Sequence, residues 1–493
     1  MKNYKYIGLL LLSFSVASCD VNNELDKITD PVQAEVALNT NGLDFSSYIA
    51  VGASFTAGFT DGALFKAGQE NSFPNILAKK FGVGATFTQP LMEDNIGGML
   101  FGGSTVIQDP RLIFDGAGPV RLDAIPTTEG TTVLTGGFNN YGIPGAKSFH
   151  IVADGLGSLL GVPLELANPY YARMATSATA NVLADAVAQS PTFFTLSDIG
   201  GNDVLGYATS GGDGSDPITP TATFDFVFTT IVDALTANGA KGVVANLPYI
   251  TSLAHFTTIP YNPVPLDADT AALLNGGYTD YNGGLQAAAA ALASTGLFSA
   301  EELAKRTITF SAGQNAMVVI DESLTDLGAI NPAFAALPKY RQATADDLFV
   351  LPLSSLIPQG YGTQIPLEDK WVLTPEEQNE IKVATDAYNA TIESVANSKG
   401  LALVDFKTLS IDALVNGYAF DNYTLTTDLV TGGMISLDGI HLTGRGYALM
   451  ANEILKAIDV TYGSNFTTAT NGLAKADDYP TNYSPTIPIR EYN

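Results

Sequence analysis

The chain is poor in the residues that build disulfides and metal centres. It contains one cysteine and three histidines among 493 residues. A single cysteine cannot form an intrachain disulfide, and His150, His255 and His441 are scattered too widely for a zinc signature. We therefore expect no metal or organic cofactor, and a stability that comes from packing alone.

Positive charge is also scarce. Lysine and arginine together number 23 against 50 aspartates and glutamates, so the formal net charge is −27. Such a chain repels phosphate backbones, which argues against a nucleic-acid partner. Hydrophobic residues make up 46% of the sequence, which is ample material for a core. The length suits one large domain with insertions or two domains, and the oligomeric state stays open.

The N-terminus has the pattern of a targeting segment. Lys2 and Lys5 precede an apolar run, Ile7 to Val16, that is too short to span a bilayer. The run ends in Val16-Ala17-Ser18-Cys19, which resembles a bacterial lipoprotein signal, although valine replaces the more usual leucine. The resemblance implies cleavage before Cys19, a lipid on its thiol, and a protein anchored in the cell envelope, at the outer membrane. We expect residues 1–18 to be the signal peptide and residues 19–45 to be an acidic tether.

Beyond the tether, short apolar runs alternate with helical periodicity. Strands are predicted at 48–51, 193–196, 243–247 and 401–406. Helices are predicted around Phe228 to Leu235, from Pro375 to Gly400, and over Tyr447 to Ile458. Alternating strands and helices indicate an α/β fold with a parallel sheet covered on both faces.

Other segments interrupt this alternation. Residues 95–140 are predicted to form loops and hairpins, and residues 206–222 a surface loop. Residues 255–374 are predicted to be an insertion, helical at Ala287 to Ala293. We place the main domain at 46–465 and a C-terminal tail without clear periodicity at 466–493.

The first strand runs directly into Gly52-Ala53-Ser54. A serine at the carboxyl end of a parallel strand lies at the edge of the sheet where ligands bind, and could act as a nucleophile. The spacing to the next glycine, Gly58, differs from the Gly-x-Ser-x-Gly nucleophile elbow. The same residues also fit a helix N-cap after a strand.

Two further segments could stabilise negative charge at the same edge. Gly200-Gly201-Asn202-Asp203 follows the strand at 193–196, and the amide of Asn202 could donate to an oxyanion. Gly145, in Tyr141 to Ala146, could present a backbone N–H. Ordinary turn chemistry explains both segments as well.

Only one histidine has a carboxylate at short spacing. Asp438-Gly439-Ile440-His441 precedes the last predicted helix, so Asp438 could orient the ring of His441 towards Ser54. His150 and His255 have no such partner and are interpreted as surface or packing residues. The alternative is a turn with Thr443 as the helix cap and His441 idle.

Together these segments resemble the SGNH/GDSL hydrolase family, with its blocks in the expected order over residues 46–462, insertions excluded. The resemblance implies a three-layer α/β/α fold with a flavodoxin-like parallel sheet and large loop insertions. It implies Ser54 as nucleophile, His441 as general base and acid, and Asp438 as its orienting group. The N–H groups of Ser54 and Gly145 and the amide of Asn202 would form the oxyanion hole. Ala53 and Phe55 depart from the family pattern, which often has aspartate and leucine there.

The predicted activity is hydrolysis of carboxylic esters through an acyl-enzyme. Lipid or short-chain acyl esters suit the apolar chain and its membrane tether. The alternatives are a carbohydrate O-acetylesterase with the same site and a surface lipoprotein that binds without turnover. The expected partners are a small ester or an acylated glycan, and the membrane through the lipid on Cys19.

Overall fold

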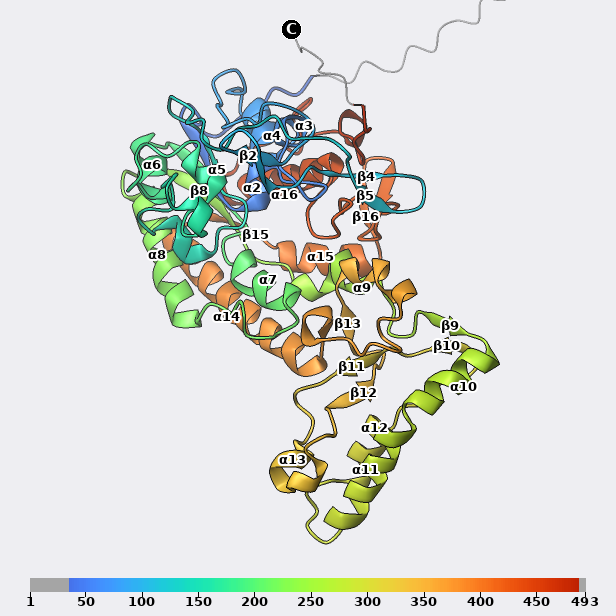
Figure 1. Cartoon of the computed structure of the whole chain (residues 1–493). Helices are drawn as coiled ribbons and strands as arrows, with labels where there is room; N and C mark the ends of the chain where they lie inside the picture. Colours follow the sequence, from blue (N-terminus) through green and yellow to red (C-terminus); the bar gives the residue numbers. More distant parts are fainter. Residues whose placement is uncertain (1–34, 487–493) are drawn as a thin grey trace, which may run out of the picture. The chain divides into compact units, whose positions relative to one another are not determined.

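The core of the fold is a five-stranded sheet in which every strand runs parallel to its neighbours (Figure 1). The computed structural model describes residues 35–486, and residues from Leu38 onwards group into one unit. The strand order is β15 (Ala402–Val404), β8 (Lys241–Ala245), β7 (Phe193–Leu196), β1 (Tyr48–Gly52) and β6 (Asn140–Gly142). The mixed α/β class and the parallel sheet predicted from the sequence are confirmed.

Four of these strands lie where the apolar runs predict them, within a few residues at their ends. Every residue of β1 and β7 is buried, as expected for strands covered on both faces. The sequence did not reveal β6, whose three residues Asn140–Gly142 were interpreted as turn chemistry. Its pairing with β1 comes from tertiary structure, because Asn-Tyr-Gly has little strand propensity of its own.

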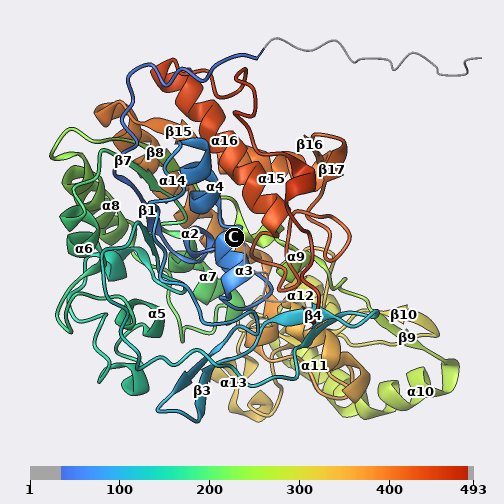
Figure 2. The same cartoon turned by 90° about the horizontal axis from the view of Figure 1, so that it is seen from above.

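Two sets of helices pack around the sheet. Helix α14 (Pro375–Lys399) contacts α8 (Thr221–Thr236) and α7 (Gly201–Thr209), while α16 (Gly444–Tyr462) contacts β15 and α4 (Phe73–Lys80). Figure 2 shows α4 and α16 side by side. The predicted ends of α14 are confirmed: Thr374 and Glu377 form a capping box at its start, and Gly400 ends it with φ +63°.

The remaining elements of the sheet-bearing part are short. Its other α-helices are α2 (Ser54–Ala57), α3 (Lys66–Glu70), α5 (Pro169–Ala172), α6 (Val182–Ala188) and α15 (Phe406–Val415). Residues 95–140 contain the expected hairpins, β2 (Met99–Phe101) with β3 (Thr105–Gln108) and β4 (Leu112–Phe114) with β5 (Pro119–Arg121). A further hairpin pairs β16 (Tyr418–Phe420) with β17 (Tyr423–Leu425).

The segment between β8 and α14 interrupts the alternation, where the sequence predicts an insertion at 255–374. It holds α9 (Ala254–Thr257), α10 (Ala268–Gly277), α11 (Thr279–Leu292), α12 (Ala300–Arg306) and α13 (Leu327–Ile330). Three antiparallel pairs join β9 (Val264–Leu266) to β10 (Gly313–Asn315), β11 (Val318–Ile320) to β12 (Tyr340–Gln342), and β13 (Leu348–Phe349) to β14 (Val372–Leu373). The insertion has apolar clusters of its own, one of them around Leu285, Ala288 and Phe298. Figure 1 shows α10 to α13 lying away from the sheet.

The described part of the predicted tail packs into the protein. Phe466, Ala474 and Ala476 are buried in the main core, and Tyr483 stacks edge-on against Phe65. The side chain of Asn452 on α16 exchanges two hydrogen bonds with the backbone of Ala474, at 2.9 and 2.8 Å. The buried apolar residues of this segment are isolated in the sequence and follow neither helical nor strand spacing. A search for hydrophobic periodicity therefore does not detect them.

No helix between residues 35 and 486 has the length and apolar character needed to cross a membrane.

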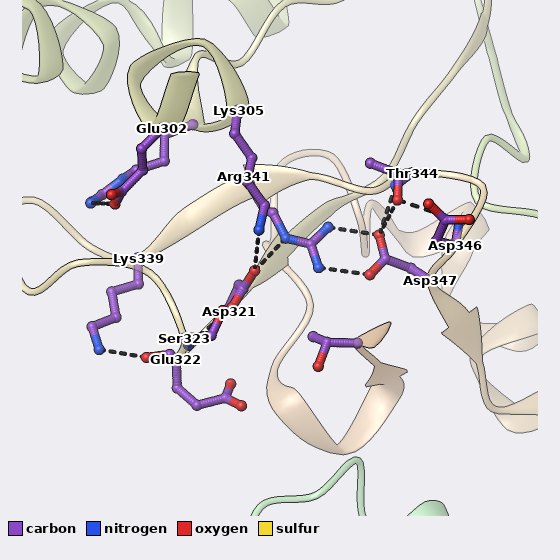
Figure 3. Close-up of polar contacts among 12 residues, drawn as sticks. Glu302, Lys305, Asp321, Glu322, Ser323, Lys339, Arg341, Thr344, Asp346 and Asp347 are labelled. Atoms are coloured by element: carbon purple, nitrogen blue, oxygen red, sulfur yellow. Dashed lines mark hydrogen bonds and ion pairs between the residues drawn. The ribbon is translucent and has the colours of Figure 1, made fainter. Parts of the chain in front are cut away.

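Arg341 on β12 anchors the insertion through two buried carboxylates (Figure 3). Its Nε donates to Asp321, and its two terminal nitrogens donate to the two oxygens of Asp347 at 2.6 Å each. Arg341 and Asp321 are at most 1% exposed. Such a group contributes most when complete, because removing one member leaves buried charge without a partner.

We expect Arg341→Met to destabilise the insertion by about 3–5 kcal/mol, since the buried carboxylate of Asp347 would lose its cation and Asp321 would keep only the longer contact to Lys305. Urea unfolding followed by the fluorescence of Trp371, the only tryptophan, measures this change near the insertion. The matched control is Arg121→Met, because Arg121 pairs with Asp109 at 3.8 Å while both side chains are largely exposed. The control should cost less than about 1 kcal/mol. Equal losses in the two variants would contradict the role of Arg341.

Candidate active site

Ser54 lies at the first residue of α2, two residues after β1 ends, and is 9% exposed. The turn between strand and helix is tightly packed at Gly52. A Cβ there would lie 2.0 Å from Thr56 Oγ1 and 2.6 Å from the carbonyl oxygen of Ser197. Only glycine fits this position without moving its neighbours, so the turn that presents the serine depends on it.

Asp198, at the end of the neighbouring strand β7, fixes this turn. Its Oδ2 accepts the N–H groups of Ala53 and Phe55 at 3.0 and 2.9 Å, and its Oδ1 accepts the hydroxyl of Thr56 at 2.7 Å. Burial raises the pKa of the Asp198 carboxyl, and these hydrogen bonds oppose that rise. Asp198 has no signal in the sequence, because an aspartate shortly before two glycines is indistinguishable from an ordinary turn residue.

Asp198 also bears on the departure from the family pattern at Ala53. Alanine has no side-chain acceptor, and α2 has no side-chain cap from its own N-cap residue. The carboxylate of Asp198 provides that acceptor from another strand. The turn is therefore held by a contact between β1 and β7 rather than by local capping.

The structure brings the three predicted triad residues into one hydrogen-bonded chain. His441 Nε2 lies 2.9 Å from Ser54 Oγ, and His441 Nδ1 lies 2.8 Å from Asp438 Oδ2. Ser54 and His441 are 387 positions apart in the sequence. The imidazole thus links the hydroxyl to a carboxylate, an arrangement in which it can take the hydroxyl proton.

Asp438 is held as a carboxylate. Its Oδ1 accepts the backbone N–H groups of Ile440 and His441, both at 2.8 Å, and its Oδ2 accepts the N–H of Gly62 at 2.7 Å. Burial raises the pKa of Asp438, but the charge of His441 and these hydrogen bonds outweigh it and hold the pKa well below its usual value. An ionised Asp438 accepts the Nδ1 proton, which leaves Nε2 free to accept from Ser54.

Two aromatic rings confine the imidazole. Phe59 lies 4.6 Å and Phe55 5.6 Å from it, centroid to centroid. Their packing limits rotation of His441, so the hydrogen bonds on its two nitrogens persist together. Phe55, the second position at which the sequence departs from the SGNH/GDSL pattern, therefore contacts the ring of His441.

The predicted oxyanion-hole residues differ in how they are placed. The side-chain nitrogen of Asn202, on the first turn of α7, donates to the carbonyl oxygen of Ala146 at 2.9 Å. This bond ties Asn202 to the residue after Gly145 and leaves its second amide hydrogen available. Gly145 is exposed with φ +77°. Within residues 35–486 the backbone N–H groups of Ser54 and Gly145 have no protein acceptor.

The other two histidines take different places. His255 is buried; its backbone N–H donates to the carbonyl oxygen of Gly439 at 2.9 Å, and its Nδ1 lies 3.3 Å from the carbonyl oxygen of Asp438. Burial lowers the pKa of His255. His255 thus supports the loop that carries Asp438, a packing role. His150 accepts the N–H of Lys147 at 3.1 Å and contacts no triad residue.

An apolar cavity opens beside Ser54. It is partly open to solvent. Ser54, Phe55 and Asn202 line one part of it. The rest is mostly aliphatic and is contributed by the segment after β8, by α15 and α16, and by the loop before α16: Leu247, Pro248, Ile250, Leu253, Phe406, Leu409, Met434, Ile435, Ile440, Leu442, Leu449 and Met450.

Within residues 35–486, one group of three carboxylates is arranged so that it could hold a metal ion: Glu322, Asp369 and Glu377. None of them belongs to the triad.

Comparisons with known proteins give no relative. No protein-family model, no curated protein and no solved structure matches this chain.

A second buried carboxyl lies beside the triad. Asp61, 1% exposed, accepts the N–H of Leu437 at 3.0 Å through Oδ1, while its Oδ2 has no partner within the described part of the chain. Burial, with a further contribution from the charge of Asp438, raises the pKa of Asp61 to about 7. At lower pH the group is a neutral carboxylic acid.

This raised pKa predicts a stability that falls as pH rises. The folded protein holds the Asp61 proton more tightly than the unfolded chain, so stability is lost between pH 4 and pH 7, roughly the unfolded and folded pKa values. Asp61→Asn keeps the shape of the neutral acid. We expect it to be more stable than the wild type by about 2–4 kcal/mol near pH 8 and equal to it near pH 4. Chemical denaturation at several pH values, with the exposed Asp123→Asn as control, tests this. A difference independent of pH would contradict it.

Proposed function

We propose that this protein is a serine hydrolase that cleaves carboxylic esters. The observation that carries the proposal is the imidazole of His441, which lies 2.9 Å from Ser54 Oγ and 2.8 Å from the carboxylate of Asp438. A purely structural histidine has no need of both partners, and a binding protein has no need of an activated hydroxyl.

In this proposal Ser54 Oγ attacks the ester carbonyl while His441 Nε2 takes its proton. His441 then gives the proton to the leaving alcohol, and an acyl-enzyme on Ser54 remains. Water, activated by the same nitrogen, hydrolyses this acyl-enzyme and restores the serine. Asp438 stabilises the imidazolium that forms at each transfer, and its low pKa suits it to remain ionised throughout.

The negative charge that develops on the carbonyl oxygen would be met by three donors: the N–H groups of Ser54 and Gly145 and the side-chain amide of Asn202. The two backbone groups are not consumed by other acceptors in the described part of the chain. The bond from Asn202 to Ala146 holds the amide in place before substrate arrives. Such preorganisation avoids reorganisation cost during the reaction.

The sheet supports the resemblance to SGNH/GDSL hydrolases. Counted in chain order, its strands lie in the order 2-1-3-4-5, which is that of flavodoxin-like doubly wound sheets. We infer a three-layer α/β/α fold of that type, with α4 and α16 on one face and α8 and α14 on the other. Ser54 and Asn202 follow the carboxyl ends of β1 and β7, where ligands bind in such sheets.

The cavity favours an ester with an apolar acyl group. Its aliphatic lining would bury a hydrocarbon chain directly beside Ser54, at a gain of about 0.8 kcal/mol for each buried methylene. An O-acetylated glycan would leave most of this surface uncovered. We therefore propose a lipid or medium- to long-chain acyl ester as substrate, with glycan deacetylation as the alternative that the assay below distinguishes.

We also propose that the protein is anchored in the cell envelope by a lipid on Cys19. The signal peptide at 1–18 and Cys19 lie outside the described residues, so the support is the sequence pattern. A membrane anchor would hold the cavity close to lipid substrates.

Ser54→Ala and His441→Ala should each lower kcat by several orders of magnitude, since triad members act as a unit. Asn202→Ala should lower it by about 10²–10³-fold through loss of one oxyanion donor. The measurement is hydrolysis of p-nitrophenyl esters from acetyl to palmitoyl by the mature protein, with the exposed Ser177→Ala as control.

Labelling by a fluorophosphonate should depend on Ser54. A folded protein with neither hydrolysis nor labelling would instead be a binding lipoprotein.

Narrowing the cavity should separate long from short substrates. Leu409 on α15 lines the cavity, and Leu409→Trp would fill part of it. We expect kcat/KM for the palmitoyl ester to fall by about 10-fold or more while that for the acetyl ester stays nearly unchanged. The control is Leu414→Trp, because Leu414 lies on the same helix, is 44% exposed and does not line the cavity. A parallel loss for both esters would contradict binding of the acyl chain there, and acetyl preference in the wild type would favour the deacetylase.

A further inference from the structure

Three carboxylates from distant segments meet at the base of the insertion. Glu322 follows β11, Asp369 begins the short 3₁₀ turn η7 (Asp369–Trp371), and Glu377 lies in the first turn of α14. One oxygen from each lies within 4.8 Å of the others. Like charges gathered this closely repel one another unless something positive lies between them.

Two oxygens of this cluster are buried without a partner. Glu377 is 4% exposed; its Oε2 accepts the N–H of Thr374 at 2.7 Å, while its Oε1 is buried and accepts no hydrogen bond within the described residues. The Oδ1 of Asp369 is buried and unpaired in the same way. Leaving a buried charged acceptor unsatisfied costs several kcal/mol, so each such oxygen calls for a ligand.

The nearby cations are engaged elsewhere. Arg341 binds Asp321 and Asp347, Lys339 donates to the backbone carbonyl of Glu322 at 2.7 Å, and Lys370 pairs with Glu368 at 2.6 Å. Lys305 lies 3.4 Å from Asp321. Figure 3 shows the carboxylate of Glu322 pointing away from both Arg341 and Lys339. No side chain among residues 35–486 therefore neutralises the cluster.

A glycine-rich loop covers the same point. This loop, residues 210–220, follows α7, and a Cβ on Gly212 would lie 2.6 Å from Glu377 Oε1. A Cβ on Gly211 would lie 1.8 Å from the carbonyl oxygen of Asp369. The φ angle is +66° at Gly211 and +73° at Gly212. The loop backbone can therefore approach the unpaired oxygens closely, as chain that lines an ion site must.

We propose that Glu322, Asp369 and Glu377 bind a divalent cation, and that the cation is Ca²⁺. The donor set consists of oxygen alone, which excludes the softer metals that prefer histidine or cysteine. Ca²⁺ accepts several carboxylates in irregular geometry, whereas Mg²⁺ keeps most of its water and takes one or two carboxylates. Three carboxylates from separate segments fit the first description.

The site would join separate parts of the protein. Glu322 belongs to the insertion, Glu377 to a helix of the main core, and the covering loop to the end of α7. The other end of α7 carries Asn202, so a bound ion would stabilise both the insertion and the helix that presents the oxyanion donor. The role is structural, because no triad residue takes part.

Calcium binding can be measured on the full mature protein after treatment with a chelator. Trp371, the only tryptophan, lies two residues after Asp369, so Tb³⁺ luminescence excited through tryptophan reports this site among the many surface acids. We expect saturable binding of one ion, displaced by Ca²⁺ more effectively than by Mg²⁺. Saturating Ca²⁺ should raise the melting temperature by about 3–6 °C.

The decisive variants are Glu377→Gln and Glu322→Gln. Glutamine at 377 keeps the oxygen that accepts the N–H of Thr374, so the capping box and the fold are retained. Each should weaken Ca²⁺ binding by at least about 10-fold. The matched control is Glu376→Gln, the exposed neighbour on the same helical turn, which should bind as the wild type does.

No binding by the wild type, equal binding in Glu377→Gln, or tighter binding of Mg²⁺ than of Ca²⁺ would overturn the proposal. Esterase activity does not enter these measurements.

Discussion

The arrangement of the site depends on the parallel pairing of β1 with β7. Val51 pairs with Leu196, so the two strands end together and the chain leaves them side by side. Gly52 and Ser54 lie where the chain leaves β1, and Asp198 lies where it leaves β7. The carboxylate of Asp198 accepts two backbone N–H groups of the turn that carries Ser54. The pairing therefore fixes the position of Ser54 independently of Asp438 and His441. The loop carrying Asp438 and His441 then needs only to approach this edge.

Three buried charged side chains of this protein differ in how their polar atoms are satisfied. Asp438 receives hydrogen bonds from Gly62, Ile440 and the His441 side chain and stays ionised. Arg341 donates from its two terminal nitrogens to Asp347 and from its Nε to Asp321. Glu377, in contrast, keeps a buried oxygen that accepts no hydrogen bond from any residue between 35 and 486. In a medium of low effective dielectric constant the first two arrangements are self-contained, while the third is the place where we propose a bound cation.

Local patterns in the sequence were sufficient for four of the five strands of the sheet and for the long helices α8, α14 and α16. Apolar runs located β1, β7, β8 and β15, and capping residues marked both ends of α14. These features are local because a buried strand needs only a short apolar run, and a helix end needs only its own cap. Strand β6 and the packed residues after Ser464 could not be found in this way. Their burial depends on what lies opposite them, as with Asn140 to Gly142 against β1.

Composition and spacing identify the residue types available for chemistry: three histidines, one of them three positions after an aspartate, and a serine directly after a strand. The folded structure is needed to show that Ser54 and His441 meet across 387 positions, that Asp198 supports the turn, and that Glu322, Asp369 and Glu377 converge. The difference arises because periodicity and capping act over only a few residues. Hydrogen bonds and charge repulsion act through space, and the folded chain alone sets those distances.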